Sequence, residues 1–332
     1  MKKFRQIIGI DVGKSTLMVH LYHGGHSRSF KNTNSGIAHL LKWVAKTNEI
    51  GSDQTLFVVD QTGLYTYKLS LALSQADIVF TMVSGLGMRR SVGIVRGKSD
   101  PIDARAIANY GYIWQEKLVP YRMPSKAIGE LKDLLKLRDR MVKQRAGYKS
   151  ALCEQKKALN LADDHLLVQS QKAMIQALSQ QIKTIEKQCR KIIRSDQNLT
   201  QQYRWITSVK GVGQQTAWHV IATTHGFTRF SKWRQLACYC GTAPFPHQSG
   251  TSIRGRTKVS HLANKNLKKL FNMCALSAIQ HDKEIKVYYQ RKIEQGKHKM
   301  VVINAVRNKI IARIFAVVER QSPFVDQHKW AA

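Results

Sequence analysis

Four aspartates in the first third of the chain have the residue type and the spacing of a carboxylate metal site. Asp11 and Asp60 each end an apolar run, and Asp100 and Asp103 lie three residues apart, so on a helix they share one face. Converging carboxylate oxygens suit Mg²⁺, either as one ion or as a pair about 3.5–4 Å apart that holds the attacking and leaving oxygens. This pattern predicts phosphodiester chemistry on nucleic acid.

Each aspartate also has a purely structural interpretation. Asp11 precedes a glycine turn, where an aspartate needs no metal. Asp100 stands before Pro101 in the usual place of a helix cap, and Asp103 complements the dipole of the same helix. The Gly9–Asp11 start is also similar to that of sugar kinases and chaperone-type ATPases. This class stays an alternative, although the two further phosphate and adenosine loops that such folds need are not found in the sequence.

The segments that must position these aspartates predict an α/β layer with a mixed sheet. The order strand, strand, strand, helix, strand, helix, strand, helix is also that of ribonuclease-H-like folds. A basic loop with Arg89, Arg90, Arg96 and Lys98 is expected before the last helix. The segments are strands at 7–12, 17–22, 27–31, 55–60 and 77–83, a helix from Asn34 or Ser35, a short helix with Leu69 and Leu73, and a helix opening at 99–105.

Two long helical patterns follow Pro120 and Pro124. The first runs from Ser125 to about Leu159, and the second repeats apolar residues at steps of three and four up to Ile192. They predict an antiparallel helical hairpin or coiled-coil arm. Such an arm either supports dimerisation or serves as a spacer.

The chain of 332 residues is long enough for two or three domains, and it carries 54 Lys and Arg against 21 Asp and Glu, a net charge of +33. Net charges of +7, +9 and +17 fall on residues 1–120, 121–199 and 200–332. This excess favours a nucleic-acid partner, with the last third as its main surface. The competing interpretation is a membrane surface, but the sequence has no long uncharged apolar segment.

The five cysteines are scattered, and no Cys-x-x-Cys or zinc-spaced histidine pair accompanies them. We expect buried, reduced thiols in a cytoplasmic protein. The cysteines are Cys153, Cys189, Cys238, Cys240 and Cys274.

Two stretches of the last third are candidate nucleic-acid contacts. The turn with Lys210, Gly211 and Gly213 is typical of helix-hairpin-helix modules, whose glycines let backbone amides approach phosphate; the alternative is a helix-packing turn. In the stretch 241–256, Ser249 precedes a glycine in a polar loop, and Arg254, Arg256 and Lys258 follow. A serine nucleophile needs a base or a metal, and its phosphoryl transition state needs cations. The loop supplies cations but no obvious base, so a phosphate-binding loop without a covalent role is an equal alternative.

Taken together, these stretches resemble the DEDD transposases of bacterial insertion sequences, the IS110 family, which also contains pilin-gene invertases. The resemblance covers nearly the whole chain. It rests on Ile8–Lys14, Asp60–Tyr65, Lys98–Arg105, Ile206–Gly213, Phe230–Ala237, and Gly241–Pro244 through Ser249-Gly250 to Arg254-Gly255.

The resemblance implies three parts: a RuvC-like domain (1–120), a coiled-coil arm (121–199) and a mainly helical C-terminal transposase domain (200–332). It implies a homo-oligomeric recombinase, guided by a structured noncoding RNA that pairs with double-stranded donor and target DNA. In such an enzyme Ser249 attacks the phosphodiester and becomes linked to DNA, and the four aspartates hold Mg²⁺ beside it. The expected location is the bacterial cytoplasm, at the nucleoid, without a membrane partner.

Two positions depart from the family pattern. The family usually has Glu where this chain has Asp60, which is one methylene shorter and must sit nearer the metal or bind through water. His261–Asn264 also differs from the usual Lys-x-Gly-Asn. We expect activity to survive the change at Asp60. Two alternatives to the recombinase stay open: a metal-only nuclease or junction resolvase, in which Ser249 only binds phosphate, and a non-catalytic nucleic-acid-binding derivative.

Overall fold

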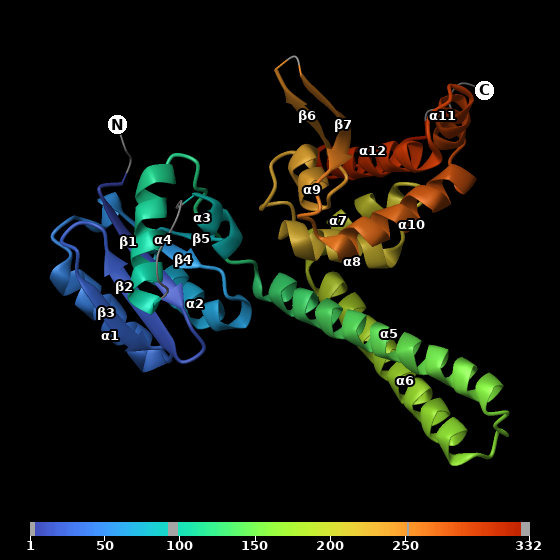
Figure 1. Ribbon diagram of the computed structural model, residues 1–332, viewed down its shortest axis with the longest axis horizontal. Coiled ribbons are helices and arrows are strands. Elements are labelled where there is room, and N and C mark those ends of the chain that lie inside the picture. The colour runs from blue at the N-terminus through green and yellow to red at the C-terminus, as the bar shows by residue number, and fades with distance from the viewer. Residues whose placement is uncertain (1–3, 92–98, 251, 327–332) are drawn as a thin grey trace. The chain divides into compact units, whose positions relative to one another are not determined.

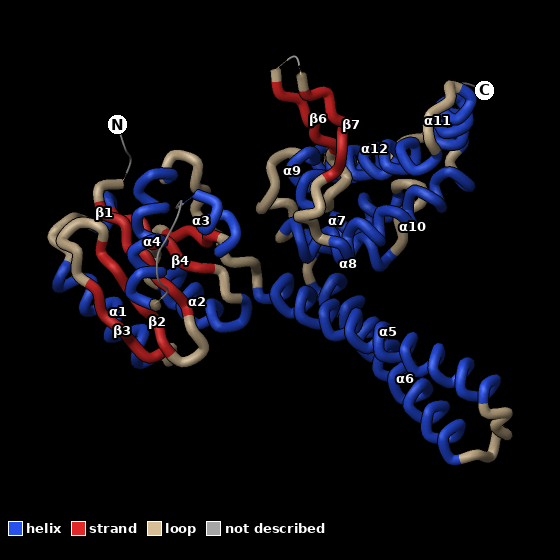
Figure 2. The backbone as a smooth tube through the Cα atoms, viewed as in Figure 1, coloured by secondary structure: helices blue, strands red, loops and turns tan. Residues whose placement is uncertain are grey.

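The computed structural model describes residues 4–91, 99–250 and 252–326, and the chain forms two compact units, Met1–Met123 and Pro124–Ala332 (Figure 1). The first unit combines strands and helices, whereas the second is mainly helical (Figure 2). Arg96 and Lys98 of the expected basic loop lie outside the described residues. Among the described residues, no helix is long and apolar enough to cross a membrane.

A five-stranded sheet in the order β3-β2-β1-β4-β5 forms the centre of the first unit, and it is mixed, as predicted. The β1–β2 and β2–β3 pairs are antiparallel, while β1–β4 and β4–β5 are parallel. The parallel pairs are reached by helical crossovers, which explains why helices separate these strands in the sequence. The strands are β1 Gln6–Val12, β2 Thr16–Leu21, β3 Ser27–Lys31, β4 Thr55–Asp60 and β5 Phe80–Val83.

Helices cover both faces of this sheet, because its central strands are apolar on both sides. Side chains of α1 and α2 pack with Ile8 and Ile10 on one face, and α4 packs with Ile7 and Val58 on the other. The helices are α1 Asn34–Thr47, α2 Tyr67–Gln75, α3 Gly85–Ser91 and α4 Asp100–Trp114, with short 3₁₀ turns at Ser52–Gln54 and Gly63–Thr66.

The predicted basic loop after β5 is in part wrong, because Gly85–Ser91 forms α3. Gly85 and Gly87 lower the helix propensity of this segment, although Ser84 precedes it and its hydroxyl accepts a hydrogen bond of 3.2 Å from the Gly87 backbone N–H, as a capping residue does. Tertiary packing compensates, since Met88 is buried against the α4 face of the sheet.

The second unit begins with two long helices, α5 Lys126–Ala158 and α6 Leu166–Ser195, which lie side by side in opposite directions (Figure 1). An ion pair of 2.8 Å between Arg138 and Glu186 and a hydrogen bond of 3.2 Å from Arg145 to Ser179 connect them. The helical hairpin thus agrees with the sequence pattern, whereas coiled-coil packing of the pair stays a prediction.

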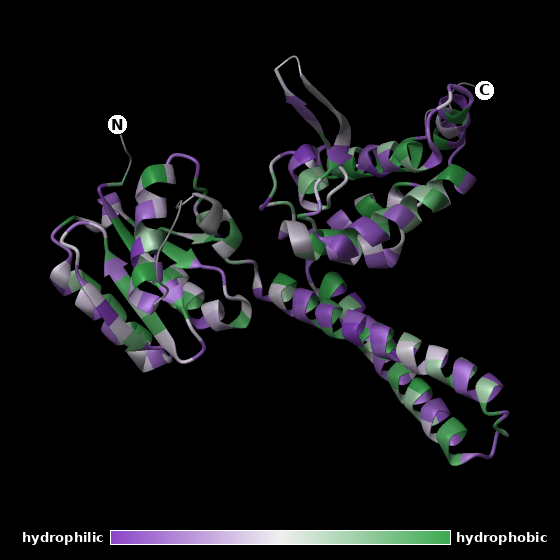
Figure 3. Ribbon diagram, in the orientation of Figure 1, coloured by the Kyte–Doolittle hydropathy of each residue, from purple (hydrophilic) through white to green (hydrophobic). Residues whose placement is uncertain are grey.

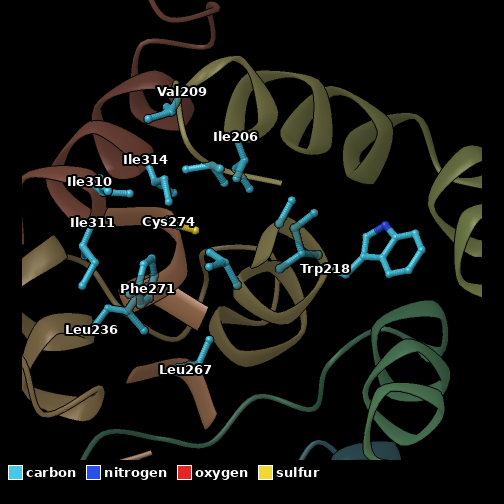
Figure 4. Close-up of a cluster of buried hydrophobic side chains, with 14 of the residues drawn as sticks. Ile206, Val209, Trp218, Leu236, Leu267, Phe271, Cys274, Ile310, Ile311 and Ile314 are labelled. Atoms are coloured by element: carbon cyan, nitrogen blue, oxygen red, sulfur yellow. The ribbon is translucent and has the colours of Figure 1, made fainter. Parts of the chain in front are cut away.

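The remaining helices of the second unit surround one apolar core that contains Trp218, Phe271 and Ile310 (Figure 4). Residues from α7, α8, α9, α10 and α12 meet there, together with the base of the helical hairpin. The helices are α7 Gln197–Ser208, α8 Gln214–Thr224, α9 Trp233–Tyr239, α10 Lys265–His281, α11 Lys283–Glu294 and α12 Lys299–Glu319.

A two-stranded hairpin, β6 Pro244–Ser249 and β7 Ile253–Val259, leaves this helical body (Figure 1). The sequence predicts a loop here, and that prediction is wrong. All six residues of β6 are exposed, so the strand has no buried face and no alternation of apolar and polar residues to reveal it. In Figure 3 the hairpin is drawn in white and purple rather than in the green of hydrophobic segments.

The five cysteines are free thiols, as expected, but they are not all buried. Cys153 and Cys238 are exposed, while Cys189, Cys240 and Cys274 are buried. Burial raises the pKa of the Cys240 thiol to about 12, so this thiol stays protonated and unreactive.

Candidate active site

Asp11 and Asp60 lie side by side at the ends of two neighbouring parallel strands. Ile10 of β1 pairs with Val59 of β4, so the next residue of each strand is an aspartate. Side chains at equivalent positions of adjacent strands point to the same face, here the face that α4 covers. The apolar runs that make both strands buried therefore also fix the positions of these carboxylates.

Asp100 and Asp103 form the first turn of α4, and α4 lies directly against β1. A Cβ added at Gly9 would meet the Ala104 carbonyl oxygen at 2.4 Å, so only glycine at this position permits the close approach. The helix cap is Ser99, which makes no side-chain capping bond, and Asp100 is the first residue inside the helix. The interpretation of Asp100 as a capping residue is therefore not supported.

The electrostatics of Asp11 show that the four carboxylates share one neighbourhood. The pKa of Asp11 is raised to about 6, first by burial and then by the charges of Asp103, Asp60 and Asp100 in that order, against a hydrogen bond from the Val12 backbone that lowers it. Among the described residues, no basic side chain contributes to this shift. Carboxylates that repel one another in a half-buried place gain stability from a cation.

The donor set therefore fits a hard divalent cation in its chemistry. The carboxylates are farther apart than direct metal ligands would be: within the described part of the chain, no three His, Cys, Asp or Glu side chains come close enough together to hold one ion. The carboxylates must move closer together to bind a metal through several direct ligands. The identity of the metal as Mg²⁺ stays a prediction.

Ser249 is the last residue of β6, where it pairs with Ile253 of β7 next to the turn of the hairpin. Its side chain is exposed, and Gly250 after it has a φ of +54°, a left-handed conformation that suits glycine. Lys258 is exposed on β7, while the side chains of Arg254 and Arg256 lie outside what the structure describes. The candidate nucleophile thus stands at the exposed end of the hairpin.

His247 is a candidate base that the sequence interpretation missed. It precedes Ser249 by two residues on β6, so both side chains occupy the same face of the ribbon. Its ring lies beside Gly255, where an added Cβ would come within 2.9 Å of the His247 Nδ1. With Lys258 it lines an open pocket of about 570 Å³ at the hairpin. The sequence predicts a loop here, and the spacing of two residues between His247 and Ser249 places both side chains on one face only if the segment is a strand.

The glycine turn between α7 and α8 packs tightly against α10. Gly211 has a φ of +87°, and an added Cβ would meet the Cys274 carbonyl oxygen at 2.7 Å. Lys210 forms an ion pair with Asp326, whereas Gly213 has open space around the position of a Cβ. This geometry accounts for Gly211 by helix packing; nucleic-acid contact by the turn stays a prediction.

Comparison with protein families gives two matches to this chain. A family model described as "Transposase", for the DEDD type of IS110, matches residues 8–159. A second, "Transposase IS116/IS110/IS902 family", matches residues 203–290. The first match spans most of the first unit and continues through α5 of the second, and the second match lies within the second unit.

Individual relatives agree with these family matches. The pilin gene-inverting protein of Moraxella bovis is 25% identical over 96% of this chain and 97% of its own length. The insertion element IS110 uncharacterized 43.6 kDa protein of Streptomyces coelicolor is 33% identical over 106 residues, which are 32% of this chain and 26% of that protein. Among solved structures, Thermus thermophilus RuvC has a TM-score of 0.28 and 13% identity, over 35% of this chain and 99% of that one.

These matches place the chain in the class of DNA transposases and recombinases, enzymes that cut and rejoin phosphodiester strands. Within this class, the chain belongs to the IS110 family of transposases. DNA is therefore a partner of this chain, and the resemblance read from its sequence is confirmed.

Proposed function

We propose that this transposase exchanges DNA strands through a covalent Ser249–DNA intermediate, with Asp11, Asp60, Asp100 and Asp103 holding Mg²⁺ at the reacting phosphate. The observation that carries the proposal is the shared neighbourhood of the four carboxylates, in which three of them raise the pKa of Asp11. Such repulsion lowers the stability of the folded chain unless a cation neutralises the carboxylates, and perturbed pKa values of this kind cluster at functional sites.

In the proposed step the hydroxyl of Ser249 attacks the phosphorus atom of a DNA phosphodiester. The Oγ–P bond forms, the bond between phosphorus and the departing sugar oxygen breaks, and that oxygen takes up a proton. The Oγ proton passes to His247, on the same face of β6. The four aspartates would hold Mg²⁺, which when bound would stabilise the charge on the phosphate oxygens. Lys258 adds a cation from β7.

We infer further that residues 1–120 form a RuvC-like domain, that 121–199 form a coiled-coil arm, and that 200–332 carry the serine. The mixed sheet and the antiparallel α5–α6 pair support the first two assignments. We also propose that a structured noncoding RNA guides the enzyme to donor and target DNA, and that the arm assembles a homo-oligomer. The net charge of +17 on the last third supports binding of nucleic acid there.

We propose Lys210, Gly211, Gly213, Arg254, Arg256 and Lys258 as nucleic-acid contacts. Lys258 is exposed and supports this role directly. For Lys210, contact requires that the ion pair with Asp326 opens.

The experiment that tests the proposed function is the trapping of a denaturation-resistant protein–DNA complex. Ser249→Ala must abolish the complex while DNA binding persists. Ser252→Ala is the matched control, because Ser252 lies in the turn of the same hairpin and is also exposed, and it must retain the complex. Cleavage by Ser249→Ala without any adduct favours the metal-only nuclease instead.

A further inference from the structure

The hairpin that carries Ser249 projects from the helical body and joins it at the start of β6 and the end of β7 (Figure 1). Its two strands form a sheet of their own, and all residues of β6 are exposed. Figure 1 shows the hairpin leaving the helical body near α9 and α12. The direction in which Ser249 points therefore depends on the residues where the hairpin joins the body.

At that junction, the hydroxyl and the carbonyl of Thr242 both form hydrogen bonds with α12, while its hydroxyl and its backbone N–H also donate to the Ala237 carbonyl of α9. Its hydroxyl donates to the Asn308 Oδ1 at 2.8 Å, and the Asn308 Nδ2 donates back to the Thr242 carbonyl at 2.9 Å. The Asn304 Nδ2 donates to the same carbonyl at 2.8 Å. Thr242 is fully buried and stands two residues before β6. These bonds fix the start of the strand that ends at Ser249.

A buried arginine, Arg307, orients the Asn304 side chain that contacts Thr242. Arg307 is 6% exposed and donates from NH1 to the Asn304 Oδ1, which leaves the Asn304 amide group directed at Thr242. Its NH2 group donates to Asn272 of α10. Arg307 thereby connects α10, α12 and the base of the hairpin.

Burial of Arg307 costs free energy. Burial lowers the pKa of Arg307, its Nε is buried without a hydrogen-bond partner, and among the described residues no carboxylate charge acts on it. Moving a charge out of water without an opposite charge beside it costs free energy. A residue whose charge does not serve stability is a candidate for a functional role.

We propose that Arg307, Asn304 and Asn308 act as a clamp on Thr242 that sets the direction of the Ser249 hairpin, so that they are positioning residues for strand exchange. The proposal rests on the proposed role of Ser249 as the nucleophile. Because a misplacement of about 1 Å can cost roughly 100-fold in rate, loosening the clamp must slow the covalent step without weakening DNA binding.

The clamp itself is tested without any activity. In the full chain with the exposed Cys153 and Cys238 replaced by serine, spin labels are placed at the exposed positions Gln248→Cys and Ala316→Cys. Thr242→Val or Arg307→Met must broaden the distance distribution between these labels while the melting temperature stays within a few degrees. Thr207→Val is the matched control, since Thr207 bonds only to carbonyls of its own helix, and it must leave the distribution narrow. Unchanged distributions in both clamp variants overturn the proposal.

The consequence for chemistry is tested by the single-turnover rate of adduct formation. Thr242→Val and Arg307→Met must lower this rate tenfold or more at unchanged DNA affinity, and Thr242→Ser, which restores the hydroxyl, must recover it. A broadened hairpin with an unchanged adduct rate overturns the positioning role. If the unmodified chain forms no adduct, the proposed function fails, whereas the label distances still decide whether the clamp exists.

Discussion

Asp11 and Asp60 occupy adjacent positions one residue beyond the Ile10–Val59 pair of β1 and β4. Their proximity comes from the register of two buried parallel strands rather than from a loop. Little further conformational entropy is therefore lost when the two carboxylates are held together. Gly9 lets α4 approach the same face and brings Asp103 into the group. The cost is mutual repulsion, which makes this place sensitive to pH and to cations.

Asp11→Asn is expected to stabilise the first unit at neutral pH. The pKa of Asp11 is about 6 in the folded chain against an ordinary value of 3.8, so the folded state binds more protons between these values. Stability therefore falls as pH rises from about 4 to about 6. The melting temperature of Asp11→Asn must exceed that of the unmodified chain at pH 7.5, and the difference must shrink at pH 4. An equal or lower melting temperature at pH 7.5 contradicts this account.

Millimolar Mg²⁺ is expected to raise the melting temperature of the unmodified chain, because a ligand that binds the folded state stabilises it. The effect must disappear in Asp11→Asn. Asp77→Asn is the matched control: Asp77 is exposed in the same unit and has a φ of +52°, which asparagine also tolerates. It must retain the full Mg²⁺ response. Equal responses in both variants would show that the ion binds elsewhere.

Asp60→Glu is expected to keep strand exchange within about tenfold, because it restores the residue usual in the family and retains a carboxylate for the metal. Asp60→Asn must reduce the rate by about 100-fold or more, as expected for the loss of one charge-stabilising group. The measurement is the recombination rate at saturating Mg²⁺. A similar rate for both variants would remove Asp60 from the site.

Gly211→Ala is expected to destabilise the second unit by about 2–5 kcal/mol, since it combines a strained φ with overpacking. The added Cβ would meet the Cys274 carbonyl oxygen at 2.7 Å. Gly213→Ala is the control, because nothing lies within 4 Å of its added Cβ. Denaturant unfolding of both variants gives the comparison. Should the two variants prove equally stable, the packing role of Gly211 is wrong.

The first unit was largely predictable from its sequence. Strands β1 and β4 are continuous apolar runs, and the Ser99-Asp100-Pro101 start of α4 is a strong helix signal. Because both strands are buried on both faces, their ends and the positions of Asp11 and Asp60 followed from local pattern alone. The proximity of all four carboxylates also requires that α4 packs against β1. Gly9 permits this close approach, but a glycine in a strand does not by itself predict it.

The base of the serine hairpin was not predictable in this way. Exposed strands leave no alternation of apolar and polar residues, so the sequence predicts a loop at β6 and β7 and gives no sign that His247 and Ser249 share a face. Thr242 and Asn308 are 66 residues apart, and only the packing of α12 beside α9 brings them together. A hydrogen-bond network of this kind depends on tertiary contacts, which local periodicity does not record.

The central claim is that Ser249 itself becomes joined to DNA, and the direct measurement is the mass of the linked peptide. The enzyme is incubated with DNA and Mg²⁺, denatured, and digested with nuclease and protease. Our account predicts a nucleotide mass on the peptide that contains Ser249, with fragmentation placing it on the Oγ of that residue. A nucleotide on Ser252 or on any other side chain, or cleaved DNA with no modified peptide, would contradict it.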